Sequence, residues 1–182
     1  FTLDYGPFGF CELFDPRFQP WTGGGEHFAF FNQQTAAEAN YQMFWGSLRP
    51  LLIGDKEALE KLDSIRDGFS SVMNQKMENM WTKKLGLVRY DAPLVNEILQ
   101  LMVDTKVDFT IFFRKLSNIP NDITDLKDSF YLPISEEIER KWIRWLQSWR
   151  GTIIKNGHKT KISADMKCIN PKYTWREWLV TP

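Results

Sequence analysis

Hydrophobic residues recur at intervals of three and four over most of the chain after residue 34, which is the spacing of one face of an α-helix. Beyond Phe1-Thr2-Leu3, no stretch shows a convincing alternation of apolar and polar positions, the pattern of a half-exposed β-strand. The sequence therefore predicts a mainly α fold. The expected helices cover residues 35–48, 55–85 with a bend near Gly68, 91–102, 108–116, 135–149 and 170 onward.

Capping residues predict where these helices begin, because a short polar side chain can accept a hydrogen bond from the free amides of the first turn. Thr35 and Glu38 have the spacing of a capping box. The other expected N-caps are Asp55, Asp91, Ser135 and Asn170, the last of them followed by Pro171 at the first helical position.

Residues 1–34 are rich in Gly, Pro and aromatic residues, a composition typical of loops that are held by packing. Phe1-Thr2-Leu3 has the character of a strand that is already under way, and residues 175–180 have that of a helix that is cut off. The expectation is that the sequence is an internal segment of a longer polypeptide.

Composition narrows the function classes. The 182 residues include 23 Lys and Arg against 23 Asp and Glu, so the whole chain offers no electrostatic attraction to nucleic acid or to an anionic membrane. An apolar fraction of 43% argues against global disorder. Apolar runs are too short to span a bilayer. Two Cys and two His, far apart in sequence, make a disulfide framework or a structural zinc site unexpected.

The sharpest candidate for chemistry is Asp4-Tyr5-Gly6, which follows an apolar strand end. The same layout occurs in the D-F-G element of kinases, in which the Asp carboxylate holds Mg²⁺ against nucleotide phosphates and the Gly lets the chain turn away. A structural Asx-turn at Asp4 is the competing interpretation, and the triplet alone favours the turn.

Other candidates have simpler structural explanations. Gly23–Gly25 lacks the Lys-Ser/Thr of a phosphate-binding loop and predicts a flexible turn. The remaining groups are expected to be packing or surface residues: His27 and His158, a methionine row at Met73, Met77 and Met80, a tryptophan row at Trp142, Trp145 and Trp149, the acidic helix start Glu136, Glu137 and Glu139, and a basic loop at Lys155–Lys161.

Several segments, taken together in their order along the chain, resemble the selenoprotein O family. The longest is Leu3-Asp4-Tyr5-Gly6-Pro7-Phe8-Gly9-Phe10 with Phe14-Asp15-Pro16 at the family's offset. The others are Phe31-Asn32-Gln33-Gln34, Lys84-Leu85-Gly86-Leu87, Asp108-Phe109-Thr110 and Asn170-Pro171-Lys172-Tyr173 with Arg176. These matches run from one end of the sequence to the other.

The resemblance implies a protein-kinase-like fold, described in the family as a pseudokinase, that transfers AMP rather than phosphate. The implied substrates are ATP, bound in a flipped orientation, and Ser, Thr or Tyr hydroxyls of proteins. Carried over by position, Asp4 is the D-Y-G aspartate, a ligand of Mg²⁺ that also borders the ATP. Gly6 and Pro7 shape the turn behind it. No nucleic acid or membrane span is implied.

The sequence also departs from the family's pattern. The proton-accepting Asp and the second metal ligand, an Asn, belong to an element that in the family lies just upstream of Phe1, so no catalytic residue is assigned in this chain. The Gly-rich loop, the nucleotide Lys and its Glu partner are absent as well. Gln34 replaces the usual Pro and Glu177 the usual Asn, which puts local packing in doubt more than chemistry.

The expected organisation is a D-Y-G and activation-loop-like segment at residues 1–34, followed by a helical C-lobe with additional helices at residues 35–182. A conventional protein kinase is one alternative, although no A-P-E follows Asp4. A non-enzymatic helical interaction domain with Trp142, Trp145 and Trp149 as anchors is the other. In the family, eukaryotic members are generally mitochondrial and bacterial members cytoplasmic. Low similarity to the family in the variable helices favours a eukaryotic member, so the expected location is mitochondrial, and cytoplasmic if the protein is bacterial.

Overall fold

A computed structural model describes residues 11–19, 25, 29–155, 157–174 and 176, and these residues are mainly helical, as the sequence predicts. In the described part, pairing of β type is limited to two isolated antiparallel bridges, Leu13 with Asp108 and Val107 with Phe130. The helices are α1 (Gln33–Leu48), the 3-10 helix η2 (Arg49–Leu52), α2 (Lys56–Asp67), α3 (Phe69–Lys84), α4 (Ala92–Thr105), α5 (Phe109–Leu116), the 3-10 helix η3 (Ile123–Ser129), α6 (Glu136–Ile154) and α7 (Lys159–Ile169).

The chain divides into two compact units, and the division falls inside α3. The hairpin unit comprises the described residues between Pro16 and Met77. The bundle unit comprises residues 11–15 together with the described residues from Glu78 onward. The stretch that follows the D-Y-G element therefore belongs to the unit formed by the later helices.

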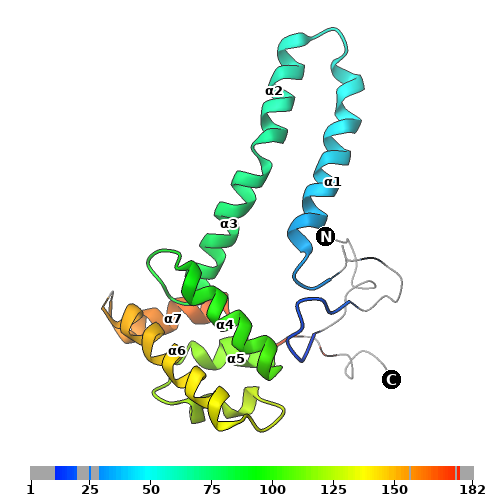
Figure 1. Cartoon of the computed structure of the whole chain (residues 1–182). Coiled ribbons are helices and arrows are strands. Elements are labelled where there is room, and N and C mark those ends of the chain that lie inside the picture. The colour runs from blue at the N-terminus through cyan, green and yellow to red at the C-terminus, as the bar shows by residue number, and fades with distance from the viewer. Residues whose placement is uncertain (1–10, 20–24, 26–28, 156, 175, 177–182) are drawn as a thin grey trace. The chain divides into compact units, whose positions relative to one another are not determined.

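In the hairpin unit, α1 runs beside α2 in the opposite direction (Figure 1). Polar contacts join the two helices more than a buried core does. Asp63 accepts hydrogen bonds from the indole of Trp45 at 3.0 Å and from Arg49 at 2.6 Å. The guanidinium groups of Arg49 and Arg66 lie 4.8 Å and 4.4 Å from the centre of the Trp45 ring, within the range of cation–π attraction.

The start of α1 differs from the prediction. The helix begins at Gln33 with Asn32 as its N-cap, and the Asn32 side chain makes no capping hydrogen bond. Thr35 lies inside the first turn, so the predicted capping box at Thr35 and Glu38 is wrong. Helical geometry extends two residues further upstream, where the Gln33 side chain donates to the carbonyl of Ala29 at 3.1 Å. The Thr-x-x-Glu spacing describes an N-terminus only when the Thr itself is non-helical.

The other helix limits in this part of the chain agree with the sequence. Asp55 caps α2 by accepting from the amide of Ala58 at 3.0 Å. The helix breaks at Gly68, which separates α2 from α3. Gly86, two residues after the end of α3, has a φ of +65°, a left-handed conformation that glycine adopts without strain. An added Cβ there would come within 2.8 Å of Ile162 and Met166, so close packing also requires glycine.

The core of the bundle unit is built around the tryptophan row of α6. Trp142, Trp145 and Trp149 are completely buried, which confirms the predicted packing role and removes them as exposed anchors for a partner. The rings of Trp145 and Trp149 stack with centroids 5.8 Å apart. Their indole N–H groups donate to the carbonyls of Leu94 at 2.9 Å and Leu85 at 2.8 Å. These bonds connect α6 to the start of α4 and to the end of α3.

Trp149→Ala is expected to lower the free energy of unfolding by about 3–5 kcal/mol, because it removes a large buried ring and orphans the Leu85 carbonyl. Trp149→Phe should cost less, since most of the apolar contact remains. Urea denaturation of the two variants measures both effects. Ile154→Ala at a half-exposed position of the same helix is the control. Similar losses in Trp149→Ala and Ile154→Ala would contradict the central role of this ring.

The starts of α4 and α6 in the bundle unit follow the predicted caps. Asp91 accepts from the amide of Leu94 at 3.1 Å, and Ser135 accepts from that of Ile138 at 3.4 Å. Glu136, Glu137 and Glu139 occupy the first turn of α6, where the helix dipole favours acidic groups. The predicted end of α4 at Met102 is three residues early, because the helix continues to Thr105.

The region before residue 171 contradicts two predictions. Helix α7 begins at Lys159, so the predicted basic loop Lys155–Lys161 is partly helical. Asn170 lies at the C-terminal end of α7, where its backbone N–H donates to the carbonyl of Met166 at 2.8 Å. It therefore does not start a helix. The described residues beyond Pro171 are not helical. An Asn-Pro pair suits either helix end, because Pro disfavours helical geometry in the residue before it.

No helix in the described ranges is both long and apolar enough to cross a lipid bilayer.

Candidate functional site

The residues predicted to bind the metal and shape its turn, Asp4, Gly6 and Pro7, lie outside the described residues, as does His27. The structure does describe the stretch that follows them, Cys11–Asp15. How this stretch is held is the most direct information on the candidate site.

Asp108 is the centre of the contacts that hold the stretch. Its side chain is almost completely buried, with 1% exposed. One carboxylate oxygen, Oδ1, accepts from the amide of Ile111 at 2.8 Å and thereby caps α5. The other, Oδ2, accepts from the hydroxyl of Tyr131 at 2.9 Å and lies 2.7 Å from Nη1 of Arg176. One carboxylate thus connects a helix start, the segment after η3 and the segment after α7.

The stretch pairs with the backbone around Asp108. Leu13 forms an antiparallel bridge with Asp108, and the amide of Phe14 donates to the carbonyl of Val107 at 2.8 Å. The ring of Phe14 is buried and stacks on Phe109 with centroids 5.4 Å apart. The stretch is therefore fixed by backbone pairing and by one aromatic anchor.

Asp108 forms an ion pair with Arg176, and the neutral hydroxyl of Tyr131 donates to the same carboxylate. Burial, followed by the hydrogen bond to Asp108, raises the pKa of Tyr131 well above its ordinary value, so the phenol stays protonated. Burial acts to lower the pKa of Arg176, but the hydrogen bond and charge of Asp108 outweigh it and raise that pKa overall. Burial also raises the pKa of the Cys11 thiol, which makes it a weak nucleophile at neutral pH.

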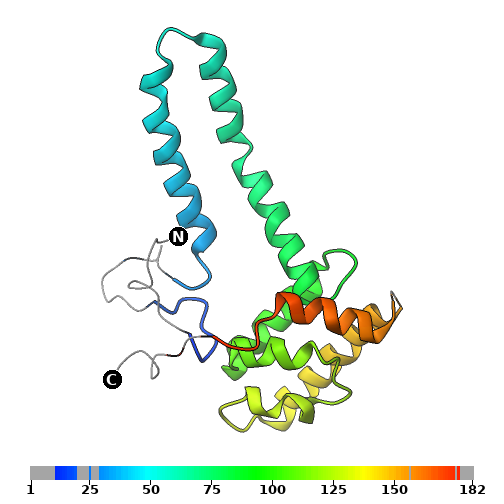
Figure 2. The ribbon, with the colours of Figure 1, turned by 180° about the vertical axis from the view of Figure 1, so that it is seen from behind.

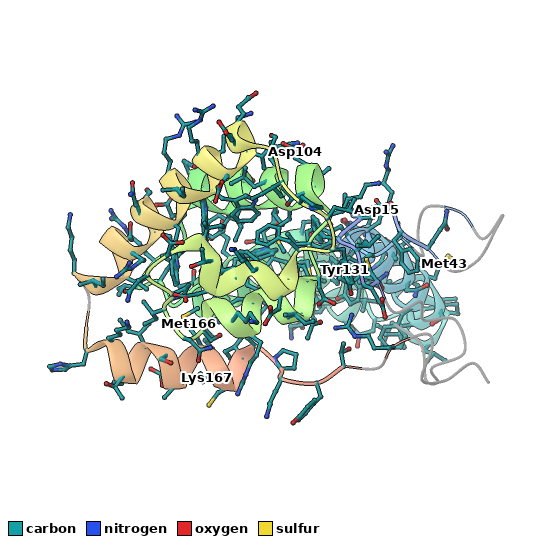
Figure 3. The ribbon with its side chains drawn as sticks, turned by 90° about the horizontal axis from the view of Figure 1, so that it is seen from below. Asp15, Met43, Asp104, Tyr131, Met166 and Lys167 are labelled. Carbon is teal, nitrogen blue, oxygen red and sulfur yellow. The ribbon has the colours of Figure 1, made fainter. Side chains whose placement is uncertain are left out.

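A second buried polar cluster joins the end of α3 to the end of α7. The Lys84 ammonium donates to Oδ1 of Asn170 at 2.9 Å. The Asn170 amide nitrogen donates to the Lys84 carbonyl and to Oγ of Ser117, each at 2.9 Å. Arg114 of α5 donates to the carbonyls of Lys167 and Asn170 at 3.0 Å and 3.1 Å. Figure 2 shows α7 lying beside α5, and Figure 3 labels Lys167 on it.

Lys84 is buried, and the oxygen that accepts from its ammonium belongs to the Asn170 amide rather than to a carboxylate. The faces of Phe109 and Phe113 lie 4.9 Å and 4.2 Å from its nitrogen and supply cation–π attraction. Burial nevertheless lowers the pKa of Lys84 to about 8.

This shift predicts a pH dependence of stability. An unfolded Lys has a pKa of about 10.4, so between pH 8 and pH 10 the unfolded chain binds a proton that the folded chain has lost. Unfolding then takes up a proton, and the Lys84 contribution makes the folded state more stable as pH rises through this window. Below pH 8 both states are charged and the contribution is constant.

The raised pKa values of Cys11 and Tyr131 make the folded state less stable as pH rises, which opposes the effect of Lys84. Both residues are present in the wild type and in Lys84→Met, so the difference between the two proteins isolates the contribution of Lys84. In urea denaturation at pH 7, 8, 9 and 10, the free energy of unfolding of the wild type is expected to rise relative to Lys84→Met by up to about 2 kcal/mol. Lys83→Met at the neighbouring exposed position should leave the pH dependence of the wild type unchanged. A constant difference between wild type and Lys84→Met across this range would contradict the prediction.

The two clusters bring together three of the segments on which the family resemblance rests. Lys84 comes from the first of them, Asp108 from the second, and Asn170 with Arg176 from the third. Sequence reasoning identified these segments in order along the chain but not their contacts, and it missed Ser117 and Tyr131. Neither residue lies in a recognisable motif, so their roles required the tertiary structure.

His158 is the N-cap residue of α7, and its side chain makes no capping hydrogen bond. It lines a shallow groove of about 530 Å³ together with Lys83, Lys161 and Cys168. No group of His, Cys, Asp and Glu side chains in the described ranges has the arrangement needed to hold a metal ion. The predicted metal ligand Asp4 remains a prediction.

Comparison with known proteins adds independent information. The family model described as "Protein adenylyltransferase SelO" matches residues 1–181. The chain belongs to the selenoprotein O family. This match includes the D-Y-G element and the segments that form both buried clusters.

Curated members of the selenoprotein O family resemble the chain along nearly its whole length. A relative from Flavobacterium johnsoniae, named protein nucleotidyltransferase YdiU, is 31% identical over 193 residues that cover 98% of this chain and 36% of the relative. Proteins of the same name from Thioalkalivibrio sulfidiphilus and Aromatoleum aromaticum are 32% and 29% identical, each over 98% of this chain and over 37% and 35% of the relative. The chain thus spans just over a third of the length of these relatives.

Proposed function

We propose that the protein carrying this chain is a nucleotidyltransferase that moves AMP from ATP to Ser, Thr or Tyr hydroxyls of other proteins. The observation that carries this proposal is the family match over residues 1–181, which includes Asp4-Tyr5-Gly6. The names of the relatives, protein nucleotidyltransferase, agree with transfer of a nucleotide to a protein. The chain would form part of a kinase-like C-lobe with additional helices.

In this proposal Asp4 holds Mg²⁺ and borders the ATP. A carboxylate is the hard oxygen ligand that Mg²⁺ prefers, and Gly6 would let the chain turn away from the metal. A bound Mg²⁺ would supply positive charge against the phosphate oxygens. In the proposed transfer, a substrate hydroxyl would give its proton to an acceptor and attack the α-phosphorus, the bond from that phosphorus to the bridging oxygen would break, and pyrophosphate would leave. One carboxylate supplies only part of a magnesium site. The other ligand and the proton acceptor would come from the upstream element that the family resemblance implies.

Two further proposals follow from this assignment. The 182-residue chain alone is expected to be inactive, because it supplies one carboxylate ligand for the metal and none of the family's nucleotide-binding residues. AMP transfer by the isolated chain above the level of its Asp4→Ala variant would refute this expectation. The location is proposed to be mitochondrial in a eukaryote and cytoplasmic in a bacterium, which fluorescence microscopy of the tagged full-length protein tests.

The experiment that tests the function uses the full-length protein with Mg²⁺, a generic protein acceptor and ATP labelled at either the α- or the γ-phosphate. Retained α-label that depends on Asp4 supports AMP transfer. Retained γ-label without α-label would identify a protein kinase instead. Absence of both labels, together with absence of Mg²⁺-dependent ATP binding, would leave a non-enzymatic helical scaffold.

A further inference from the structure

We propose that the groove between the end of α3 and α7, here called the α7 groove, binds an acidic segment of the protein that receives AMP. Residues between Lys83 and Val88 line one side of this groove, and α7 with the two residues before it lines the other. Both sides belong to the bundle unit, and α7 lies beside the end of α3 in Figures 1 and 2. The identity of the occupant as the AMP acceptor rests on the proposed function.

The first argument is the apolar floor of the α7 groove. Ile162 of α7 lies directly over Gly86, where an added Cβ would come within 2.8 Å of it. Val88 and Ile169 also line the groove, and their side chains are 71% and 41% exposed. Apolar side chains that are open to solvent in a groove favour a partner that covers them.

The second argument is the charge of the lining residues. Lys83 and Lys161 are exposed, and neither forms an ion pair with another described residue. The exposed helix α6 differs, because its Lys141 pairs with Glu137 at 2.9 Å. Among the described side chains that line the groove, Asp165 is the one carboxylate. Two free cations against one carboxylate favour an anionic partner.

The third argument is the distance between the two cations. Lys161 lies in the first turn of α7, whereas Lys84, the neighbour of Lys83, bonds to Asn170 just beyond the other end of that helix. Positions 161 and 170 are about 13 Å apart along a helix. The two lysines therefore start from opposite ends of the groove, too far apart for one phosphate group to join them.

An extended peptide has the matching dimensions. Its residues rise by about 3.3 Å each, so the first and fifth side chains of a segment lie about 13 Å apart and on the same side as the third. Asp165 lies midway along the lining face of α7 and would repel an acidic residue at the centre of the segment. The groove thus fits an acidic residue at each end and an apolar residue in the middle, as in Glu-Ser-Leu-Ser-Glu.

The binding test uses the full-length protein and three peptides that carry the same uncharged dye: Glu-Ser-Leu-Ser-Glu, Glu-Ser-Ser-Ser-Glu and Lys-Ser-Leu-Ser-Lys. Fluorescence anisotropy measures their dissociation constants. The groove variant combines Lys83→Glu with Lys161→Glu, and a conservative variant has Arg at both positions. The matched control combines Lys76→Glu with Lys127→Glu, which changes the net charge equally at exposed lysines outside the groove.

The wild type is expected to bind Glu-Ser-Leu-Ser-Glu at least about 10-fold more tightly than either other peptide, because only this peptide covers the floor and meets both cations. The groove variant should lose this affinity and should bind Lys-Ser-Leu-Ser-Lys more tightly than the wild type does. Such a gain cannot come from a variant that fails to fold. The conservative variant and the matched control should keep the wild-type preference.

A second measurement tests whether the occupant is the AMP acceptor. Unfolded acceptor chains with a single Tyr carry Glu-Ser-Leu-Ser-Glu or Glu-Ser-Ser-Ser-Glu at about 20, 40 or 60 residues from that Tyr, so that flexible linkers of several lengths are sampled. The apolar centre should lower KM by about 10-fold at the best spacing, because docking raises the local concentration of the hydroxyl. The value of kcat should stay unchanged, and the groove variant should remove the difference in KM.

Equal binding of the acidic and basic peptides to the wild type, or an equal loss in the matched control, would overturn the proposed specificity of the groove. Absence of peptide binding, as expected if a second copy or another part of the full-length polypeptide covers the groove, would overturn it too. Binding without a lower KM at any spacing would overturn the acceptor role. Selective binding by a protein that transfers no AMP would overturn the proposed function and leave a groove for an acidic partner.

Discussion

Asp4→Ala in the full-length protein is expected to reduce AMP transfer by at least about 100-fold, because it removes a carboxylate that holds Mg²⁺ against the phosphates. The fold should be unaffected, since the predicted role of Asp4 is to bind a metal and not to pack. The measurement is the initial rate of α-label transfer to protein at saturating ATP, at several Mg²⁺ concentrations. Higher Mg²⁺ should restore little of the rate, because a ligand is missing.

The matched control for this prediction is Asp104→Ala. Asp104 is an exposed aspartate near the end of α4 that accepts a hydrogen bond from Gln100 at 2.8 Å. Its loss should leave the transfer rate near that of the wild type. If Asp4→Ala keeps more than about a tenth of the wild-type rate, Asp4 is better explained as the residue of a structural turn.

Asn170→Ala is expected to lower the free energy of unfolding by about 3–5 kcal/mol, as much as Trp149→Ala. Asn170 is completely buried, and its side chain makes three hydrogen bonds with Lys84 and Ser117. The alanine would leave the buried Lys84 ammonium without its oxygen acceptor. It would also leave the Lys84 carbonyl without the donor that Asn170 supplies.

Urea denaturation at pH 7 measures this loss, with Asn118→Ala at an exposed position as the control. The control should change stability by less than about 0.5 kcal/mol. A double variant, Lys84→Met with Asn170→Leu, should be less destabilised than the sum of its single variants, because no charge is then left unpaired. Additive losses would show that the two side chains do not stabilise each other.

Much of the helical architecture could be predicted because its signals are local. The caps at Asp55, Asp91 and Ser135 bond to amides three residues away, so they depend on the sequence alone. The packing role of the tryptophan row of α6 could be predicted for the same reason, since helical spacing places its members on one face. The break at Gly68 is likewise a property of one residue.

The predictions that were wrong concern signals that suit more than one structure. Thr35 and Glu38 have the spacing of a capping box, but the helix starts upstream of them. Helix α7 was not predicted, because Met166 is its one buried residue. A helix that buries so little has a weak pattern of apolar positions. Asn170 was placed at the start of a helix because Asn-Pro fits either end, and it follows α7 instead.

The sequence by itself determined the mainly α class, most helix starts and the family, because caps, apolar spacing and motifs are properties of neighbouring residues. Only the tertiary structure decided which residues of these motifs contact one another. Lys84 meets Asn170 across 86 positions, and Arg176 reaches the carboxylate of Asp108. Such contacts depend on how helices pack, since most buried polar groups are hydrogen-bonded and the partner is the group that packing brings within reach. No local pattern specifies that choice.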